Sequence, residues 1–169
     1  NPAPKGFKPF YVTHYGRHGS RYQTSDRFYR KNTPWMVELR EKGLLTEKGK
    51  QLCEEMVWLQ QEHKGVEGTL TAKGGFEQQG VAERLYDRCP QIFNQKDRPV
   101  VTSRSTNVHR VIQSMGNFNL GLKGRQPKLR MTQLTGDRYW DVLCHSTKGI
   151  ERPEKARMHE VLDSLYEVY

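Results

Sequence analysis

The order of apolar and polar residues predicts short strands that alternate with amphipathic helices. Residues 10–14 are apolar or favour β structure, which indicates a strand buried on both faces, as in a parallel sheet. Apolar residues at helical spacing follow over 46–63 and again from Thr71, and a threonine is placed to cap the start of each helix. Pro90 is expected to end the second of these helices.

The second half of the chain repeats this order. Residues 98–103 indicate a strand, and Ser105 or Thr106 is placed to cap a third helix. A strand at 128–134 and a charged helix at 152–169 follow. Strands and helices in this order predict an α/β fold with a mostly parallel sheet flanked by helices. The third helix should cover the sheet with an apolar stripe, made of Val108, Val111, Ile112, Met115 and Phe118.

Residues 23–34 lack a clear period and are rich in Arg, Lys, Asn and Thr. They are predicted to form a loop with some helix. Arg27, Arg30 and Lys31 are therefore candidates for the rim of a substrate site, although a solvated run of charge is the more common explanation for each of them.

The charge of the chain is unevenly distributed. The net charge is +9, and residues 1–50 hold eleven Lys and Arg against four acids, while residues 96–130 hold eight against one. A positive field concentrated in two segments attracts polyanions. Nucleic acid is not the expected partner, because no zinc-finger spacing, repeat or RNA-binding signature accompanies this charge.

Cysteine content and hydropathy exclude little else. Cys53, Cys89 and Cys144 cannot all pair within the chain, so one disulfide with a free thiol and three thiols both stay open, and no C-x-x-C spacing indicates a metal. No apolar run approaches the roughly 18 residues of a membrane helix, so membrane insertion is not expected. The start at Asn1, without methionine or a signal peptide, indicates a processed or trimmed terminus.

The candidate chemistry lies in residues 13–22, T-H-Y-G-R-H-G-S-R-Y. Arg17 and Arg21 offer planar forks of donors suited to phosphate oxygens, and the two glycines allow a close approach of an anion. His18 between them would face the phosphate. A positive field favours its neutral imidazole, which is a competent nucleophile toward phosphorus. On spacing alone, a basic surface turn without function is the alternative.

A second block, V-V-T-S-R-S-T-N-V-H-R-V-I-Q-S-M at 100–115, adds two further arginines. R-H-G-S-R at 17–21 resembles the R-H-G-x-R signature of the histidine acid phosphatases, a branch of the histidine phosphatase superfamily that includes phytases. The block at 100–115 resembles the R-S-T-x-x-x-R segment of the same family. The wider context of the first motif is most similar to the multiple inositol polyphosphate phosphatases.

This resemblance implies a role for each matched residue. His18 would be the nucleophile that becomes phosphohistidine, with Arg17 and Arg21 as the clamp on the phosphate. Arg110 matches the last position of the second motif and would complete that clamp, while Arg104 matches its first position and would be a rim contact. Three arginines can bind three oxygens of one phosphoryl group, and no metal or other cofactor is implied.

The resemblance also implies that the chain is a fragment. Residues 1–130 would form the amino-terminal part of the phosphatase core, and 131–169 the end of that segment and the start of a helical cap domain. The proton donor is expected beyond Tyr169, because His159 and Glu160 fit a helix better than the H-A-E or H-D motif of the family. The remaining part of the same polypeptide would then be a partner. Resemblance to an exported family predicts a periplasmic or secreted location.

Three functions stay open at this point. The motifs and the charge favour a phosphomonoester hydrolase that acts on inositol polyphosphates such as phytate through a phosphohistidine intermediate. A catalytically incomplete fragment, or a polyanion-binding module, would share the arginines without turnover. A basic nucleic-acid-binding domain would need neither His18 nor Arg110.

Overall fold

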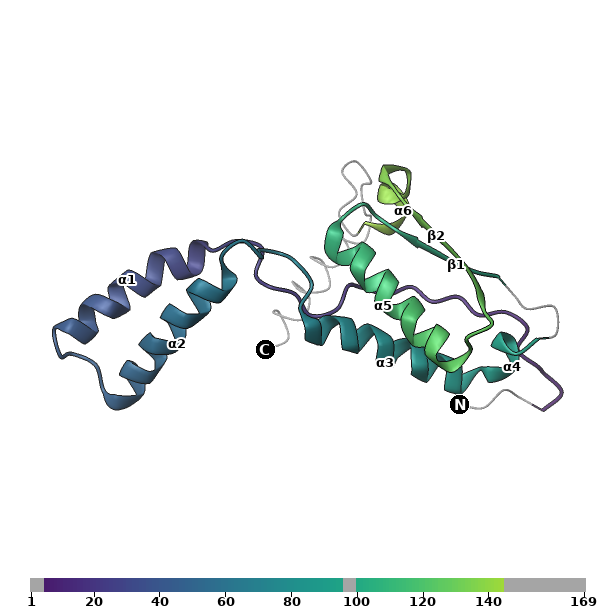
Figure 1. The fold of residues 1–169 in the computed structure, drawn as a ribbon, viewed down its shortest axis with the longest axis horizontal. Coiled ribbons are helices and arrows are strands. Elements are labelled where there is room, and N and C mark those ends of the chain that lie inside the picture. The colour runs from purple at the N-terminus through teal and green to yellow at the C-terminus, as the bar shows by residue number, and fades with distance from the viewer. Residues whose placement is uncertain (1–4, 96–99, 145–169) are drawn as a thin grey trace, which may run out of the picture.

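A computed structural model describes residues 5–95 and 100–144 of the chain. Figure 1 shows two long helices, α3 and α5, packed together next to a two-stranded sheet, and a helical hairpin of α1 and α2 that projects to one side. No helix in these ranges is long and apolar enough to cross a membrane. The helix predicted at 152–169 lies outside the described residues.

The hairpin has its own small core. Helix α1 (Arg27–Glu41) packs on α2 (Glu47–His63). Thr46 caps α2 as predicted, since its Oγ1 accepts a hydrogen bond from the amide of Gly49 at 3.2 Å. The buried cluster between the two helices consists of Met36, Cys53 and Met56.

The prediction of a loop with some helix over 23–34 underestimates the helix, because α1 begins at Arg27 and continues through Pro34 to Glu41. An interior proline costs a helix about 3 kcal/mol, and the local sequence has no clear period. Burial of Met36 against Cys53 and Met56 explains the helix, since tertiary packing supplies most helical stability in proteins.

The main layer of the fold is formed by α3 (Ala72–Arg88) and α5 (His109–Arg125). The two helices approach so closely that a Cβ atom on Gly121 would lie 2.5 Å from the carbonyl oxygen of Gln79. Pro90 ends α3 as predicted but also opens the short helix α4 (Pro90–Phe93), because proline suits the first position of a helix. The buried core next to this pair consists of Ala82, Phe93, Leu122 and Leu129.

The sheet pairs β1 (Val100–Ser105) with β2 (Arg130–Thr135) in parallel, in a register that aligns the first residues and the last residues of the two strands. The predictions of both strands and of their parallel order are confirmed, and each strand extends further than predicted at its carboxyl end. A 3₁₀ helix, η1 (Asp137–Tyr139), and α6 (Trp140–Leu143) follow β2.

The predicted start of the third helix is wrong. Helix α5 begins at His109 after Val108, without a side-chain cap, because Ser105 still belongs to β1 and the carbonyl of Thr106 accepts a hydrogen bond from the Thr135 hydroxyl at 3.1 Å. The apolar stripe is confirmed in part, since Val111, Met115 and Phe118 line the cavity that β1 also lines and Phe118 packs against the buried core. Its members are only half-buried, and the most buried residues of α5 are Ser114, Asn119, Gly121 and Leu122.

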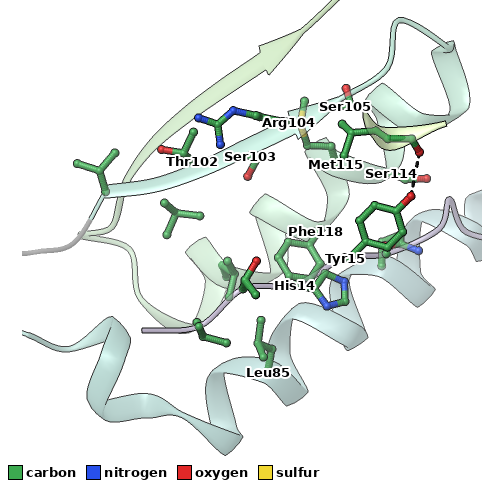
Figure 2. Close-up of a pocket in the computed structure, with 18 of the residues that line it drawn as sticks. His14, Tyr15, Leu85, Thr102, Ser103, Arg104, Ser105, Ser114, Met115 and Phe118 are labelled. Atoms are coloured by element: carbon green, nitrogen blue, oxygen red, sulfur yellow. Dashed lines mark hydrogen bonds between the residues drawn. The ribbon is translucent and has the colours of Figure 1, made fainter. Parts of the chain in front are cut away.

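Residues 10–14 do not form the predicted strand. Phe10 is 86% and Tyr11 72% exposed, and only Val12 packs against the core. This segment and β1 line the same cavity of about 660 Å³, and Figure 2 shows them on opposite sides of it. A strand needs a neighbour to pair with its backbone groups, and within the described residues β1 pairs with β2 instead.

The contact at Gly121 predicts a stability difference between two glycines of the same helix. Gly121→Ala should lower the free energy of unfolding by about 1–3 kcal/mol, because the methyl group meets the backbone of α3. Gly116→Ala meets no atom within 4 Å and should stabilise α5 by up to about 1 kcal/mol. Urea unfolding followed by circular dichroism measures both, and equal effects would contradict the packing described.

Candidate active site

The loop that carries R-H-G-S-R lies directly on the first turn of α3. Two glycines make this possible: a Cβ atom on Gly19 would lie 2.2 Å from the carbonyl oxygen of Gly74, and one on Gly74 would lie 2.1 Å from that of Ser20. Thr71 caps α3 by accepting the amide of Gly74, and its own amide and hydroxyl donate to the Ser20 carbonyl. The helix start and the loop therefore share one set of hydrogen bonds.

Two further side chains of α3 hold the loop. The Glu77 carboxylate accepts both the amide of Ser20 at 2.8 Å and its hydroxyl at 2.7 Å. These bonds, the backbone one first, lower the pKa of Glu77, because they stabilise the charged carboxylate. Gln78 donates from Nε2 to the carbonyl oxygen of Arg17 at 3.1 Å. Both sides of His18 are thus fixed to α3.

His18 is partly buried, and its Nδ1 lies 2.8 Å from the carbonyl oxygen of Gly19. Because a carbonyl only accepts, this contact assigns the ring proton to Nδ1 and leaves the lone pair on Nε2. Burial lowers the pKa of His18, and the positive charges of Arg110, Arg17 and Arg21 lower it further, against the opposing effect of the Gly19 carbonyl. The neutral ring is therefore favoured.

The three arginines around His18 differ in their setting. Arg21 donates from Nη1 to the carbonyl of Tyr22 at 2.8 Å, whereas the side chain of Arg17 is exposed. The Nε atoms of Arg21 and Arg110 are buried and have no hydrogen-bond partner among the described residues. Each of these N–H groups would be stabilised by an acceptor, because an unpaired buried donor is costly.

Arg110 reaches the backbone turn at Gly68, which has a φ of +70°. A Cβ atom there would lie 3.8 Å from Nη1 of Arg110. The amide of Gly68 also donates to the carbonyl of Gln23 at 2.7 Å. Arg110 therefore lies where the hairpin of α1 and α2 joins the main layer, while its charge still acts on His18.

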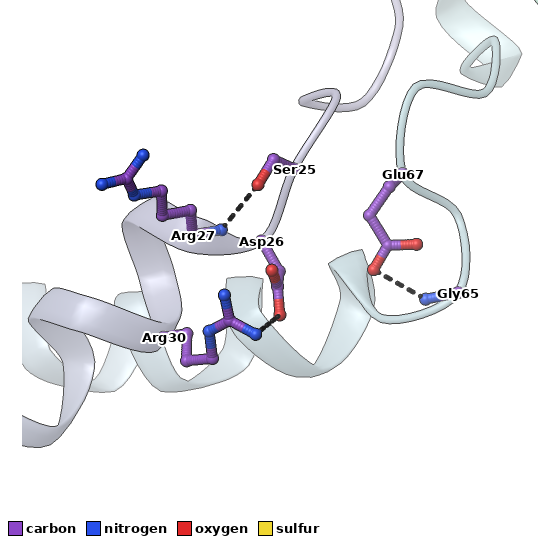
Figure 3. Close-up of polar contacts among 6 residues, drawn as sticks. All are labelled: Ser25, Asp26, Arg27, Arg30, Gly65 and Glu67. Carbon is purple, nitrogen blue, oxygen red and sulfur yellow. Dashed lines mark hydrogen bonds and ion pairs between the residues drawn. The ribbon is translucent and has the colours of Figure 1, made fainter.

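The predicted rim residues lie further from this centre. Arg104 is exposed on β1 and lines the cavity, but it is not among the charges that shift the pKa of His18. Arg27, Arg30 and Lys31 are exposed in the first turns of α1. Figure 3 shows Arg30 turned to Asp26, at 4.0 Å, while Arg27 points away from it. Their contacts with substrate stay predictions.

The sequence motifs did not identify the residues that hold the loop. Glu77, Gln78 and Ser114 do not belong to R-H-G-S-R or to R-S-T-x-x-x-R, and the sequence predicts Thr71 only as a helix cap. Ser114 of α5 accepts the amide of Gly19 at 3.2 Å. Only the spacing of Gly74 after Thr71 signals a close backbone contact, because glycine early in a helix is otherwise unfavourable.

The cysteines take no part in this site. All three are free thiols, and Cys53 is buried in the hairpin. Among residues 5–95 and 100–144, no group of three His, Cys, Asp or Glu side chains could hold a metal ion.

Comparison with known proteins identifies the fold. No family model matches the chain, and no curated protein matches it. Among the similar solved structures is the multiple inositol polyphosphate phosphatase of Bifidobacterium longum in complex with phosphate, at 23% identity and a TM-score of 0.63. Its apo form and its complex with inositol hexasulfate are similar at 22% identity, with TM-scores of 0.62 and 0.59.

Each of these matches covers 75% of this chain but only 26% of the Bifidobacterium enzyme. The described chain is therefore a helix-rich α/β structure that matches part of a histidine-phosphatase-like fold. The expected fold class is confirmed. The division of the chain at about residue 130 stays a prediction.

The charges around His18 predict its titration. In the folded protein the pKa of His18 should lie below the ordinary value of 6.5, and Arg110→Ala should raise it, because one positive charge is removed. Arg30→Ala, which removes a charge beside Asp26 instead, is the matched control and should leave the pKa unchanged. The pH dependence of the His18 Cε1–H resonance gives the pKa of His18 in the parent and in both variants. Equal shifts of this pKa in the two variants would refute the grouping of Arg110 with His18.

Proposed function

We propose that the protein is a phosphomonoester hydrolase of the histidine acid phosphatase type that acts on inositol polyphosphates. The observation that supports this most directly is the setting of His18, whose Nδ1 is bonded to the Gly19 carbonyl and whose pKa is lowered by burial and by the charges of three arginines. Arg21 and Arg110 each add a buried N–H without a protein partner in the described part of the chain. A nucleophile and cationic donors at one point are the requirements of phosphoryl transfer.

In the proposed reaction, Nε2 of His18 attacks the phosphorus atom and forms a P–N bond as the ester P–O bond breaks. The leaving oxygen takes a proton and departs as an alcohol. Water then attacks the phosphohistidine, which releases inorganic phosphate and restores the neutral ring. Arg17, Arg21 and Arg110 would neutralise the charge on the transferred group throughout, which is the main contribution of a protein to this chemistry.

The proton donor is not assigned to a described residue. His159 and Glu160 lie outside the described ranges, and we propose that the donor belongs to a part of the polypeptide beyond residue 169. General acid catalysis contributes roughly 10²–10⁴ to such a step. It matters more for an inositol alkoxide than for a nitrophenolate, which leaves without a proton.

The proposal of a polyphosphate substrate is supported by the positive charge of the chain and by the resemblance to inositol polyphosphate phosphatases. Arg104, Arg27, Arg30 and Lys31 would contact phosphates other than the one being transferred. One of the similar Bifidobacterium structures holds inositol hexasulfate, a polyanion with the same skeleton as phytate. The proposal includes a periplasmic or secreted location, which rests on the resemblance alone.

The nucleophile is tested by His18→Ala. In the full-length protein this variant should abolish hydrolysis of phytate and of p-nitrophenyl phosphate but retain phosphate binding, because the arginines remain. Labelling of the parent enzyme with ³²P should give an acid-labile, base-stable phosphoenzyme that the variant lacks. Label on a serine or an aspartate would refute the mechanism. Polyanion binding without any turnover in the parent would favour the binding module.

The clamp is tested by comparing Arg110, whose charge acts on His18, with Arg30, which is exposed on α1. Arg110→Ala should lower kcat/KM for p-nitrophenyl phosphate by about 10²–10³, by analogy with the loss of one donor to a developing charge. Arg30→Ala removes an exposed arginine of α1 and should change the same constant by less than about threefold. Equal losses would show that Arg110 is not part of the clamp.

A further inference from the structure

Ser114 is a buried hydroxyl that joins the His18 loop to helix α5. It is 4% exposed and lies on the side of α5 that meets the loop. Its Oγ accepts the amide of Gly19 at 3.2 Å and donates to the carbonyl of Arg110 at 2.7 Å. The same Gly19 residue holds the ring of His18 through its carbonyl oxygen at 2.8 Å.

These bonds meet at Gly19 from two sides. The Arg110 carbonyl orients the Ser114 hydroxyl hydrogen, which leaves the lone pairs of Oγ directed away from the helix backbone. One of them receives the Gly19 amide, which fixes the peptide between His18 and Gly19. The Gly19 carbonyl belongs to the following peptide, whose Ser20 amide donates to Glu77 at 2.8 Å, and it accepts from Nδ1 of His18. That oxygen decides which nitrogen of His18 carries the proton, and its place depends on both anchored peptides.

A purely structural explanation accounts for only part of this arrangement. A serine bonded to the carbonyl four residues earlier gains little for a helix, and often destabilises it slightly. The second contact of the Ser114 hydroxyl, to the Gly19 amide, would be lost with an apolar side chain at this position. Without the hydroxyl the buried amide of Gly19 would have no other partner among the described residues, and the loop would shift to regain one.

We infer that Ser114 is a positioning residue for the nucleophile, which fixes the peptide between His18 and Gly19 and so keeps the Gly19 carbonyl in reach of Nδ1, with the lone pair left on Nε2. The consequence for catalysis rests on the proposed function. The same hydroxyl is bonded to the backbone of Arg110. One side chain of α5 therefore contacts both the loop of the nucleophile and the backbone of one arginine of the clamp. A displacement of about 1 Å at such a centre can reduce a rate by about 10².

The test compares Ser114→Ala with Ser103→Ala in the full-length protein. Ser103 is the matched control, because its hydroxyl also bonds a residue of α5, Asn119 at 2.8 Å, without touching the loop. The ¹⁵N chemical shifts of the His18 ring report its tautomer, and thermal unfolding reports stability. Ser114→Cys, which has a similar shape and a weaker donor, replaces the alanine variant if that variant does not fold.

The parent and Ser103→Ala should show a single Nδ1-protonated tautomer, and Ser114→Ala a mixture of the two. Its kcat for p-nitrophenyl phosphate should fall by about 10–100-fold with little change in KM, as expected when a supporting hydrogen bond is lost. An unchanged tautomer and kcat, with only a loss of thermal stability like that of Ser103→Ala, would overturn the inference. If the parent has no phosphatase activity, the proposed function fails, while the tautomer comparison still decides the role of Ser114.

Discussion

The arrangement of the site depends on one backbone contact, between the loop at Gly19 and Ser20 and the first turn of α3 at Gly74. At this distance neither Gly19 nor Gly74 could carry even a methyl group, because it would overlap the opposite backbone. The contact lets Thr71 serve both as the cap of α3 and as a partner of the loop. The backbone that follows His18 is therefore held against the start of the helix.

The same contact determines the electrostatics of His18. The loop is held against α3 on one side and against Ser114 of α5 on the other, and the imidazole is partly buried as a result. The charge of Arg110 then acts on His18 together with those of Arg17 and Arg21. Burial and positive charge both disfavour the imidazolium. A histidine in this setting stays neutral below the pH at which an exposed ring would be protonated, which suits a nucleophile better than a general acid.

The hairpin of α1 and α2 is a separate packing unit with its own buried cluster. It meets the main layer at the turn of Gly68, next to Arg110. The positively charged first turns of α1 are consequently near the junction, but Arg30 already faces Asp26. Their exposure is compatible with contacts to a large anion and does not itself indicate one.

The sequence by itself determined the α/β class, the parallel strands β1 and β2, the caps at Thr46 and Thr71, and the candidate group of His18, Arg17, Arg21 and Arg110. These features depend on local periods, on capping chemistry and on short motifs. Tertiary structure alone decided that 23–34 is largely helical, because Met36 is buried on α2, and that 10–14 forms no strand with the described part of the chain. It also decided the partners of the loop, Glu77 and Ser114, since hydrogen bonds between residues 57 and 95 positions apart leave no local pattern.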